Sequence, residues 1–471
     1  MNPRELPVDR LATTDAQGNR IYLYPSDVRG RYRTRRSVLN AVLMTIFLGL
    51  PWVHVGGHQA ILLDLPRRRF ALFGLTFWAH DAPLLVLVVG TAALCLALAT
   101  AIWGRVWCGW GCPQTVFVDG LFRKIERWVE GDAPARRHLD AGPMSPAKLT
   151  KKAAKWALFA VAALVISHSF LAYFVGVDQL ERMVASSPSD SPGAFAVMAL
   201  VTGGILFDFG WFREQFCTLV CPYGRFQSVL MDDRSTVVAY DPARGEPRKG
   251  TETPPAKAGD CVNCYRCVQV CPTGIDIRRG VQMECIACTA CMDACDDVMA
   301  RLKRPPGLIR YGTQATTEGK KEDPLAWHQR ARVLVTAALL VLFIGGLGAA
   351  VATREPLEMT LIRAVDTPYQ EVTSADGRPE VINHFKMDLR NQTFAPLKLR
   401  FSLDGADQAR GETWVVSNHA EELAAGQSER ADLFIRFPAA VLSFGHAQAT
   451  LQVESGSTRT RTEVRLVGPL R

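Results

Sequence analysis

The C-terminal segment of this sequence, residues 355–471, contains no cysteine, although the whole chain has 13. This segment is therefore neither stapled by disulfides nor a site for thiolate-bound metals. Charge is absent from other stretches: residues 84–103 hold no Asp, Glu, Lys or Arg. A run of about twenty apolar residues matches a hydrocarbon core of about 30 Å, crossed at about 1.5 Å per residue. The chain is therefore predicted to cross a membrane.

A cleavable leader is not evident either, because the first apolar run begins near Val38 and no small-residue cleavage site follows it. Arg35-Arg36-Ser37 resembles a twin-arginine export signal, but a basic flank on an uncleaved helix gives the same pattern. The net charge of +8 arises largely from Lys and Arg residues that flank the apolar runs. We therefore expect contact with membrane lipid and no nucleic-acid partner.

Five apolar runs are predicted to span the membrane. They cover residues 38–56, 84–103, 156–176, 194–212 and 331–352. Residues 1–37 hold eight Lys or Arg and residues 104–155 hold ten, whereas residues 177–193 hold only Arg182. Because basic loops remain in the cytoplasm, this alternation predicts a cytoplasmic N-terminus. It also predicts that residues 213–330 are cytoplasmic and that everything after Thr353 lies outside.

The segment from Glu355 onward is predicted to be a separate β domain. Short alternating runs lie at 382–389 and 397–401, with further strand-like runs near 412–416, 431–437, 447–453 and 460–467. Asp-Gly pairs at 376–377 and 404–405 are typical of turns between strands. About seven strands over roughly 115 residues favour an immunoglobulin-like β-sandwich.

Eight cysteines within a window of 35 residues form the most specific pattern in the chain. The spacing C-x2-C-x2-C-x3-C occurs twice, from Cys261 to Cys271-Pro272 and from Cys285 to Cys295. Three cysteines spaced in this way can wrap one four-iron, four-sulfur cube, and the fourth ligand is crossed between the two loops. Two [4Fe-4S] clusters are predicted, one on Cys261, Cys264, Cys267 and Cys295 and the other on Cys285, Cys288, Cys291 and Cys271. Zinc is the alternative, but zinc sites use two cysteine pairs rather than two triplets.

The second cysteine loop departs from the first at its end, because Cys295 is followed by Asp296 and not by proline. Asp293, Asp296 and Asp297 surround this position. Their negative charge is expected to make the cluster bound by Cys295 harder to reduce. Iron–sulfur assembly and free thiols together favour the reducing side of the membrane for this segment.

Four other cysteines form a weak internal repeat. Cys108-Gly-Trp-Gly-Cys112-Pro113 follows the second apolar run, and Cys217-Thr-Leu-Val-Cys221-Pro222 follows the fourth. The predicted topology places both elements at the membrane face that carries the ferredoxin segment. Soft thiolates suit Cu(I), zinc or a further iron–sulfur centre, whereas small buried, redox-inert thiols are the alternative. The repetition favours a functional copper or redox site formed by Cys108, Cys112, Cys217 and Cys221.

The remaining polar candidates are less specific. His54 and His58 could share a helical face and bind a metal, but Gly56 and Gly57 between them favour a polar loop. His168 and Asp208 fall within predicted spans, where ionisable groups suggest function, although Asp208 lies near an interface. Cys95 is expected to be core material. The basic run at residues 67–69 is expected to bind lipid headgroups.

Several motifs together resemble the FixG/CcoG/RdxA family of membrane polyferredoxins. The residues that carry the resemblance are Pro51-Trp52, Gly57-His58-Gln59-Ala60, Leu63-Asp64-Leu65-Pro66, Phe70, Phe73-Gly74, Gly104-Arg105-Val106-Trp107-Cys108 and Cys112-Pro113-Gln114-Thr115. The second Cys-x3-Cys-Pro element, the double ferredoxin segment, the fifth span and the β domain follow in the family's order. The cysteine motifs alone also occur in wider NapH- and NosR-like electron-transfer proteins.

The resemblance implies a protein of the bacterial inner membrane that assists assembly of cbb3-type cytochrome c oxidase. It implies an oxidoreductase similar to a cupric reductase, which reduces Cu(II) to Cu(I). The expected partners are a cytoplasmic electron donor and copper chaperones or oxidase assembly factors. Electrons would pass from the two clusters to the four membrane-edge cysteines, where copper is reduced.

Two other functions remain open at the level of sequence. One is an assembly scaffold or sensor in which the clusters are structural and the outer domain binds a partner. The other is a quinol-linked electron-transfer subunit like NapH, for which no trustworthy haem or quinone signature is present. The predicted domains are a cytoplasmic segment (1–37), a four-helix membrane region (38–230), the ferredoxin domain (231–330), the fifth helix (331–352) and a periplasmic immunoglobulin-like domain (353–471).

Overall fold

The computed structural model divides the chain into a helical unit that carries all the cysteines and a second unit that carries the C-terminal β domain. The structure describes residues 13–15, 17, 19–55, 58–65, 69–78, 82–249, 259–313, 330–365, 367–374, 376–393, 395–403, 422–455 and 458–470. The predicted strand at 412–416, the Asp-Gly turn at 404–405 and most of the basic run at 67–69 lie outside the described residues.

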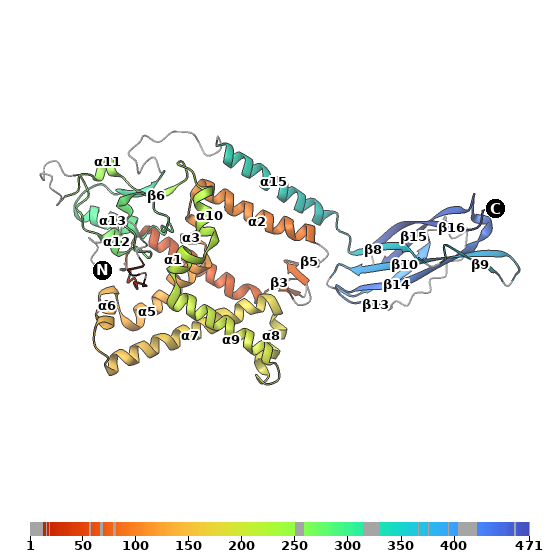
Figure 1. Cartoon of the computed structure of the whole chain (residues 1–471), viewed down its shortest axis with the longest axis horizontal. Helices are drawn as coiled ribbons and strands as arrows, with labels where there is room; N and C mark the ends of the chain where they lie inside the picture. Colours follow the sequence, from red (N-terminus) through yellow and green to blue (C-terminus); the bar gives the residue numbers. More distant parts are fainter. Residues whose placement is uncertain are drawn as a thin grey trace. The chain divides into compact units, whose positions relative to one another are not determined.

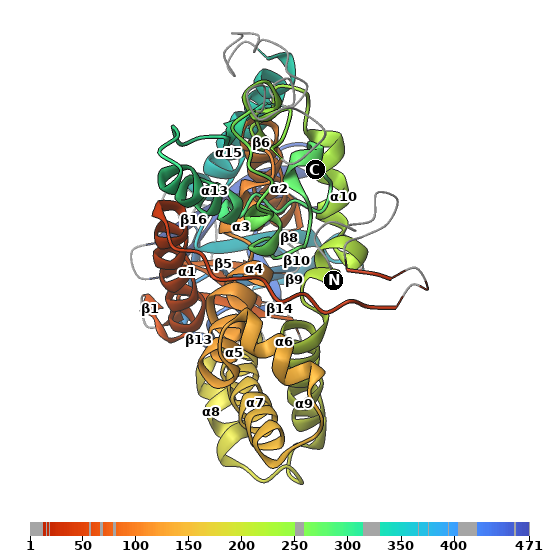
Figure 2. The ribbon, with the colours of Figure 1, turned by 90° about the vertical axis from the view of Figure 1, so that its left-hand side faces the viewer.

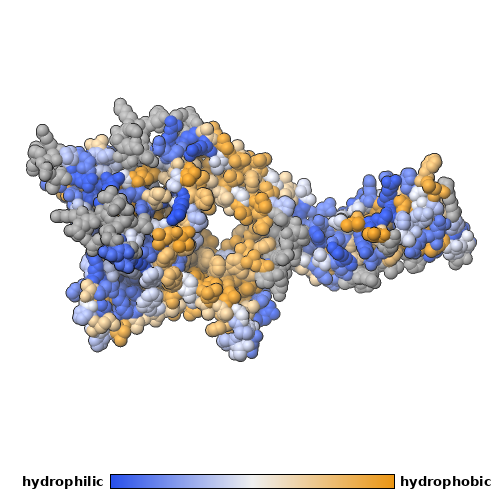
Figure 3. All heavy atoms as spheres, in the orientation of Figure 1, coloured by the Kyte–Doolittle hydropathy of each residue, from blue (hydrophilic) through white to orange (hydrophobic). Residues whose placement is uncertain are grey.

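Five long helices dominate the helical unit (Figure 1). They are α1 (Arg31–Gly49), α2 (Ala82–Trp103), α7 (Pro146–Val175), α9 (Pro192–Phe207), which continues through the π-helical turn η4 (Asp208–Phe212), and α15 (Ala331–Ala352). The last four are long and apolar enough to cross a membrane over Pro83–Trp103, Pro146–Val175, Pro192–Phe212 and Ala331–Ala352. Hydrophobic side chains gather over α2, α15 and the neighbouring helices α7 and α9 (Figure 3).

The predicted first span is wrong in its bounds. Helix α1 begins at Arg31 rather than near residue 38, and the chain leaves it through the 3₁₀ turn η2 (Leu50–Trp52). Residues 54 and 55 are not helical, because they form the strand β1 (His54–Val55). Pro51 and the Gly56-Gly57 pair explain the early end, since neither residue type favours a helix interior.

Helix α1 nevertheless runs the length of the membrane region. At its start, the buried Arg36 contacts Asp119, close to α5 (Arg123–Glu130). Near its end, the Phe47 carbonyl accepts a hydrogen bond of 2.8 Å from the Tyr173 hydroxyl in the last turn of α7. The 19 residues of α1 span about 28 Å at 1.5 Å per residue, close to the bilayer core. We therefore count α1 as the fifth span, although its four arginines distinguish it from the others.

Short helices join the spans at the end of the unit that holds the cysteines. They are α3 (Val106–Trp110), α4 (Pro113–Phe117), the π-helical turn η3 (Val118–Phe122), α5, α6 (Ala133–Ala141) and α10 (Pro222–Leu230), with the π-helical turn η5 (Phe216–Val220) before α10. At the other end, α8 (Val177–Ala185) joins α7 to α9. Three π-helical turns in one region are unusual, and such turns occur frequently at functional sites.

The ferredoxin segment is built from two short helices and one small sheet. Helix α12 (Arg266–Gln269) lies within the first cysteine loop and contains Cys267, and α13 (Ala290–Arg301) begins within the second and contains Cys291 and Cys295. The strand β6 (Val237–Tyr240) pairs antiparallel with β7 (Ile309–Gly312). The carboxylate of Asp293 on α13 accepts hydrogen bonds from the backbone amides of Tyr32 and Arg33 at 3.2 and 2.7 Å. It therefore caps the first turn of α1, and Figure 2 shows α13 above that end of α1.

The C-terminal domain is a two-sheet antiparallel sandwich, as predicted. One sheet has the order β14 (Ser428–Pro438), β10 (Pro379–Asn391), β8 (Leu357–Arg363), with β9 (Gln370–Thr373) also paired to β10; the other has β12 (Arg400–Leu403), β15 (His446–Ser455), β16 (Thr458–Val467). The short strands β11 (Leu397–Lys398) and β13 (Glu422–Leu423) form a further pair. Alternate residues of β10 are buried, so the period-two pattern forms the core with Leu433 and Leu451.

Candidate iron–sulfur and thiol site

The first and second cysteine loops repeat in conformation as well as in sequence. Each has a non-glycine residue with positive φ on both sides of its middle cysteine: Asn263 (55°) and Tyr265 (57°) in the first loop, and Ala287 (52°) and Thr289 (62°) in the second. A left-handed conformation costs such residues about 1–2 kcal/mol each, and it is an outlier for the β-branched Thr289. Strain of this kind persists only where the surrounding structure imposes it, commonly at ligand sites.

Charge effects between the thiols favour the two crossed groups that the spacing predicts. The thiol of Cys295 is affected by the charges of Cys261 and Cys264, and the thiol of Cys267 by those of Cys295 and Cys264. Burial raises the pKa of Cys291 most, and the charges of Cys288, Cys285, Cys271 and Cys267 raise it further. The trailing cysteine of each loop is therefore close enough to the opposite triplet to raise the pKa of a thiol there. Their role as cluster ligands remains a prediction.

One cavity of the structure suits the second group. Its lining includes the four thiols of Cys271, Cys285, Cys288 and Cys291, with Cys267 of the first group and the apolar side chains Ile275, Ile277 and Ile286. Four convergent thiols in an apolar pocket form the donor set that a [4Fe-4S] cluster requires. Among the described residues, no three His, Cys, Asp or Glu side chains are grouped to hold a single metal ion.

Burial favours the protonated form of five of the loop thiols when no metal is bound. Burial, followed by the charges of neighbouring thiols, raises the pKa of Cys285 and of Cys295 to about 12. Burial likewise raises the pKa of Cys267, Cys288 and Cys291. A bound metal centre supplies the positive charge that makes the thiolate form favourable, so metal binding at these sites must release protons.

Each cysteine loop has one buried arginine beside it that sequence reasoning missed. Arg278 forms two hydrogen bonds to the Asp276 carboxylate, donates to Asn263 Oδ1 at 2.7 Å and lowers the pKa of Cys267. Arg36, from the membrane helix α1, lowers the pKa of Cys288 in the second group. Both guanidinium groups offset the negative charge of nearby thiolates. The sequence marked Arg36 only as part of a basic flank or of a motif that resembles an export signal, and neither pattern indicates a contact with a cysteine loop.

The three aspartates near Cys295 have different surroundings. They therefore do not contribute equally to the predicted effect of negative charge on reduction of the cluster that Cys295 would bind. Asp293 caps α1, and Asp297 forms an exposed ion pair with Arg301 at 2.8 Å. Asp296 accepts a hydrogen bond from the Gly307 amide at 2.8 Å and raises the pKa of Cys295. Only Asp296 therefore acts directly on the thiol of Cys295.

The four membrane-edge cysteines come together from the two Cys-x3-Cys-Pro elements. Burial raises the pKa of Cys217, and the charges of Cys112, Cys108 and Cys221 raise it further. The two elements also share a helix start: Cys112 and Cys221 are the N-cap residues of α4 and α10, with similar backbone angles and proline at the next position. The weak internal repeat is thus a structural repeat, although the metal or redox role of the four thiols remains a prediction.

Polar groups around Cys108 and Cys112 reduce the effect of burial on the pKa values of these two thiols. Burial outweighs a hydrogen bond from Gln227 and raises the pKa of Cys108 to about 11. Gln227 is fully buried on α10, and its amide nitrogen lies 3.2 Å from the Cys108 sulfur. Burial raises the pKa of Cys112, and the backbone amides of Gln114 and Thr115 lower it. Helix N-termini favour thiolates in this way. Gln227 was not found from the sequence, since it lies six residues beyond Cys221.

The two cysteine systems are in direct contact. The indole Nε1 of Trp110, in the first Cys-x3-Cys-Pro element, donates to the Ala287 carbonyl of the second cluster loop at 3.2 Å. Arg105 donates to the carbonyls of Met283 and Gly224, and its charge lowers the pKa of both Cys108 and Cys285. A small cavity lined by Cys217, Pro272, Thr273 and Ile286 separates Cys217 from the cluster loops.

Gly109 makes this contact possible. A Cβ atom at position 109 would overlap the carbonyl of Ile286 and the backbone of Ala287. We expect Gly109→Ala to destabilise the unit by about 1–3 kcal/mol, the usual cost of overpacking, and to lower its melting temperature in detergent. Gly203→Ala in α9 is the matched control, because nothing lies within 4 Å of a Cβ there. Equal melting temperatures for the two variants would contradict the close contact.

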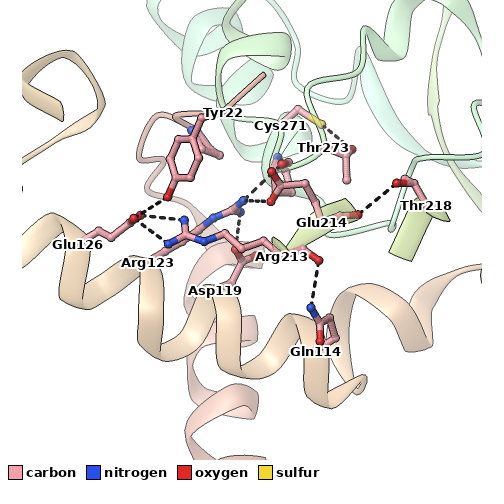
Figure 4. A network of polar contacts seen from close by, with 12 residues as sticks. Tyr22, Gln114, Asp119, Arg123, Glu126, Arg213, Glu214, Thr218, Cys271 and Thr273 are labelled. Atoms are coloured by element: carbon pink, nitrogen blue, oxygen red, sulfur yellow. Dashed lines mark hydrogen bonds and ion pairs between the residues drawn. The ribbon is translucent and has the colours of Figure 1, made fainter. Parts of the chain in front are cut away.

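A network of buried charges holds the same surface together (Figure 4). Asp119 pairs with Arg36 and Arg123, each at 2.6 Å, and Arg123 reaches Glu214 at 3.2 Å. Glu126 accepts from Arg213, from Arg136 and from the Tyr22 hydroxyl, at 2.7, 2.9 and 2.7 Å. The network ties α1, α5, α6 and the N-terminal segment to the start of the second Cys-x3-Cys-Pro element.

The pKa of Glu126 predicts acid sensitivity. Burial raises this pKa, but Arg213 and its hydrogen bonds outweigh burial and lower it from the ordinary 4.5 to about 2. A carboxyl whose pKa is lowered by folding contributes stability that is present above the unfolded pKa and is lost as the pH falls toward the folded value. We expect this contribution to disappear between about pH 4.5 and pH 2. Melting temperatures measured across that window should fall more steeply for the wild type than for Glu126→Gln.

The remaining candidates from the sequence lie in strands, form hydrogen bonds to nearby groups, or are exposed. His54 and His58 lie in two paired strands, β1 and β2 (His58–Gln59), and not on one helical face. His168 Nδ1 is 2.7 Å from the Leu164 carbonyl of its own helix. Asp208 accepts from Gln114 Nε2 at 3.0 Å. Cys95 is exposed on α2, so its prediction as core material is wrong; a long apolar helix can turn such a residue toward lipid.

These features define a membrane iron–sulfur electron-transfer protein. The family described as "4Fe-4S dicluster domain" matches residues 212–314, and "4Fe-4S binding domain" matches residues 85–130, which include Cys108 and Cys112. The family described as "IG-like fold at C-terminal of FixG, putative oxidoreductase" matches residues 347–469.

Whole-chain relatives identify the family. The chain is 36% identical to Protein RdxA of Cereibacter sphaeroides over 82% of each chain, and 35% identical to Nitrogen fixation protein FixG of Rhizobium meliloti over 82% of this chain and 80% of that protein. It therefore belongs to the FixG/RdxA family. Ferredoxin-type protein NapH of Haemophilus influenzae is more distant, at 22% identity over 56% of this chain and 85% of that protein.

Proposed function

We propose that this protein reduces Cu(II) to Cu(I) at the four membrane-edge cysteines and thereby assists assembly of cbb3-type cytochrome c oxidase. The observation that carries the proposal is that Cys108, Cys112 and Cys221 are close enough to Cys217 to raise its pKa, in a region that contacts the second cluster loop through Trp110. Soft thiolates stabilise Cu(I) relative to Cu(II), and reduction of one Cu(II) consumes one electron from a cytoplasmic donor.

The protein's own groups would prepare this site. Residues 261–295 would hold two [4Fe-4S] clusters with the crossed ligand sets, which supply one-electron transfer when bound. The amides at the start of α4 stabilise the Cys112 thiolate, and Gln227 orients the Cys108 sulfur. Trp110 and Arg105 hold the first Cys-x3-Cys-Pro element against the second cluster loop. We further propose that this surface faces the bacterial cytoplasm and that the immunoglobulin-like domain is periplasmic, because loop charges support that orientation.

The test is copper reduction by the anaerobically purified protein. We expect the rate to fall to background when Cys108, Cys112, Cys217 and Cys221 are replaced by alanine together, and also when the eight loop cysteines are replaced. Cys95→Ala, an exposed cysteine outside both groups, is the control and should retain the wild-type rate. A normal rate without the eight cysteines would contradict the electron path; a normal rate without the four would contradict only the copper site.

A second candidate for the four thiols is a further [4Fe-4S] cluster, which the family match over residues 85–130 favours. A measurement of iron content distinguishes a copper site from a further cluster. The four-alanine variant should retain all its iron if the thiols act on copper, and should lose about four iron atoms per chain if they hold a cluster. A scaffold with structural clusters predicts that neither cysteine group affects copper reduction. A NapH-like quinol role predicts cluster reduction by a quinol analogue.

A further inference from the structure

A second cavity, with six cations in its lining, lies beside the buried charge network. It holds about 40 Å³, between the N-terminal segment, the start of α1, α5 and the cluster loops, and includes Pro272 and Ala290. The charged side chains that line it are the cations Arg33, Arg36, Arg123, Lys124, Arg127 and Arg136 and the anions Asp27 and Asp119. None of the functions proposed above uses it.

Carboxylates partner four of the six cations. Arg36 and Arg123 pair with Asp119, Arg136 pairs with Glu126, and Arg127 pairs with Asp27 at 2.7 Å. The side chains of Arg33 and Lys124 have no carboxylate partner within the described part of the chain. The charge of Arg33 and that of Arg127 lower the pKa of Lys124, after burial, which has the largest effect. The cavity therefore retains an uncompensated positive charge.

Two buried nitrogen atoms at the cavity also lack a hydrogen-bond partner among the described residues. They are the Nε atoms of Arg123 and Arg136. Arg136 is 5% exposed, so its free N–H group is cut off from bulk water. A buried donor on a charged group that lacks an acceptor is energetically costly. Uncompensated cations and unused donors at one cavity indicate a missing anion with several acceptor oxygens.

We propose that this cavity binds a phosphate group, held by Arg33 and Lys124 with the free N–H groups of Arg123 and Arg136. Guanidinium groups match phosphate oxygens in a fork, and lysine adds a mobile point charge. A cavity of about 40 Å³ has roughly three times the space that one water molecule needs. The group could belong to a soluble phosphate compound or to an anionic lipid headgroup, since both present the same oxygens.

The test uses the full-length protein in nanodiscs of phosphatidylcholine, titrated with inorganic phosphate by calorimetry. We expect saturable binding in the wild type, weakened about tenfold or more in Lys124→Met and in Arg33→Met, because a hydrogen bond to a charged group contributes about 1.5–3 kcal/mol. Arg31→Met, on the same helix but outside the cavity lining, is the matched control and should bind as the wild type does. Iron content verifies that each variant is folded.

Nanodiscs that contain phosphatidylglycerol distinguish the two sources. If a lipid headgroup fills the cavity, this lipid should suppress the binding of inorganic phosphate and remain with the wild type, but not with Lys124→Met, in native mass spectrometry. If the ligand is soluble, phosphate binding should be unchanged. The proposal is overturned if the wild type shows no saturable binding in phosphatidylcholine, or if Lys124→Met and Arg31→Met bind equally. Neither readout depends on copper reduction.

Discussion

Glu126→Gln is expected to destabilise the helical unit by about 3–5 kcal/mol, the cost of breaking a buried ion pair. Glu126 is 1% exposed, and its carboxylate faces both Arg213, which is 2% exposed, and Arg136. Glutamine keeps the shape of the side chain but removes its charge, so two buried guanidinium groups lose their counter-ion. The melting temperature in detergent, followed together by tryptophan fluorescence and cluster absorbance, measures the effect.

Asp27→Asn is the control for this experiment. It removes one carboxylate from the ion pair with Arg127, whose partners are 45% and 46% exposed. Exposed pairs contribute about 0–1 kcal/mol, so we expect little change in the melting temperature. If Glu126→Gln were no more destabilising than Asp27→Asn, water or another anion would already compensate Arg213 and Arg136.

Cys288→Ala is expected to remove one cluster and leave the other, with a loss of about four iron atoms per chain. Its thiol lies in the second group, in the cavity with Cys271, Cys285 and Cys291. Iron and acid-labile sulfide measured on anaerobically purified protein give the stoichiometry. Cys95→Ala should retain all its iron, because Cys95 is exposed in α2.

The same assay tests the crossed ligands. Cys295→Ala should remove the cluster that Cys264→Ala removes, and the EPR spectrum of the reduced protein should lose the same signal in both variants. The structure favours this result because the charges of Cys261 and Cys264 raise the pKa of Cys295, after burial, which has the largest effect. Loss of the signal that Cys288→Ala removes would show that each loop keeps its own fourth ligand.

Some features of the fold were predicted correctly because the local spacing of apolar residues determines them. The period-two pattern of residues 382–389 predicted the β10 core, and the apolar runs predicted four of the five spans. The first span was misplaced because its helix begins among arginines. Arg36 lies within that helix, 1% exposed, since Asp119 and the Gly109 carbonyl satisfy its charge and its N–H groups. A hydropathy pattern cannot anticipate partners about 70 to 80 residues away in the chain.

The C-terminal domain contains no cysteine, so every candidate thiolate ligand lies outside it. The sequence by itself determined the donor atoms: two triplets with trailing cysteines, and two Cys-x3-Cys-Pro elements, whose spacing is covalent and local. Only the tertiary structure brought Trp110 to Ala287, Gln227 to Cys108 and six cations to one cavity. Those contacts join segments far apart in the chain, and long-range packing and charge compensation, rather than local spacing, decide them.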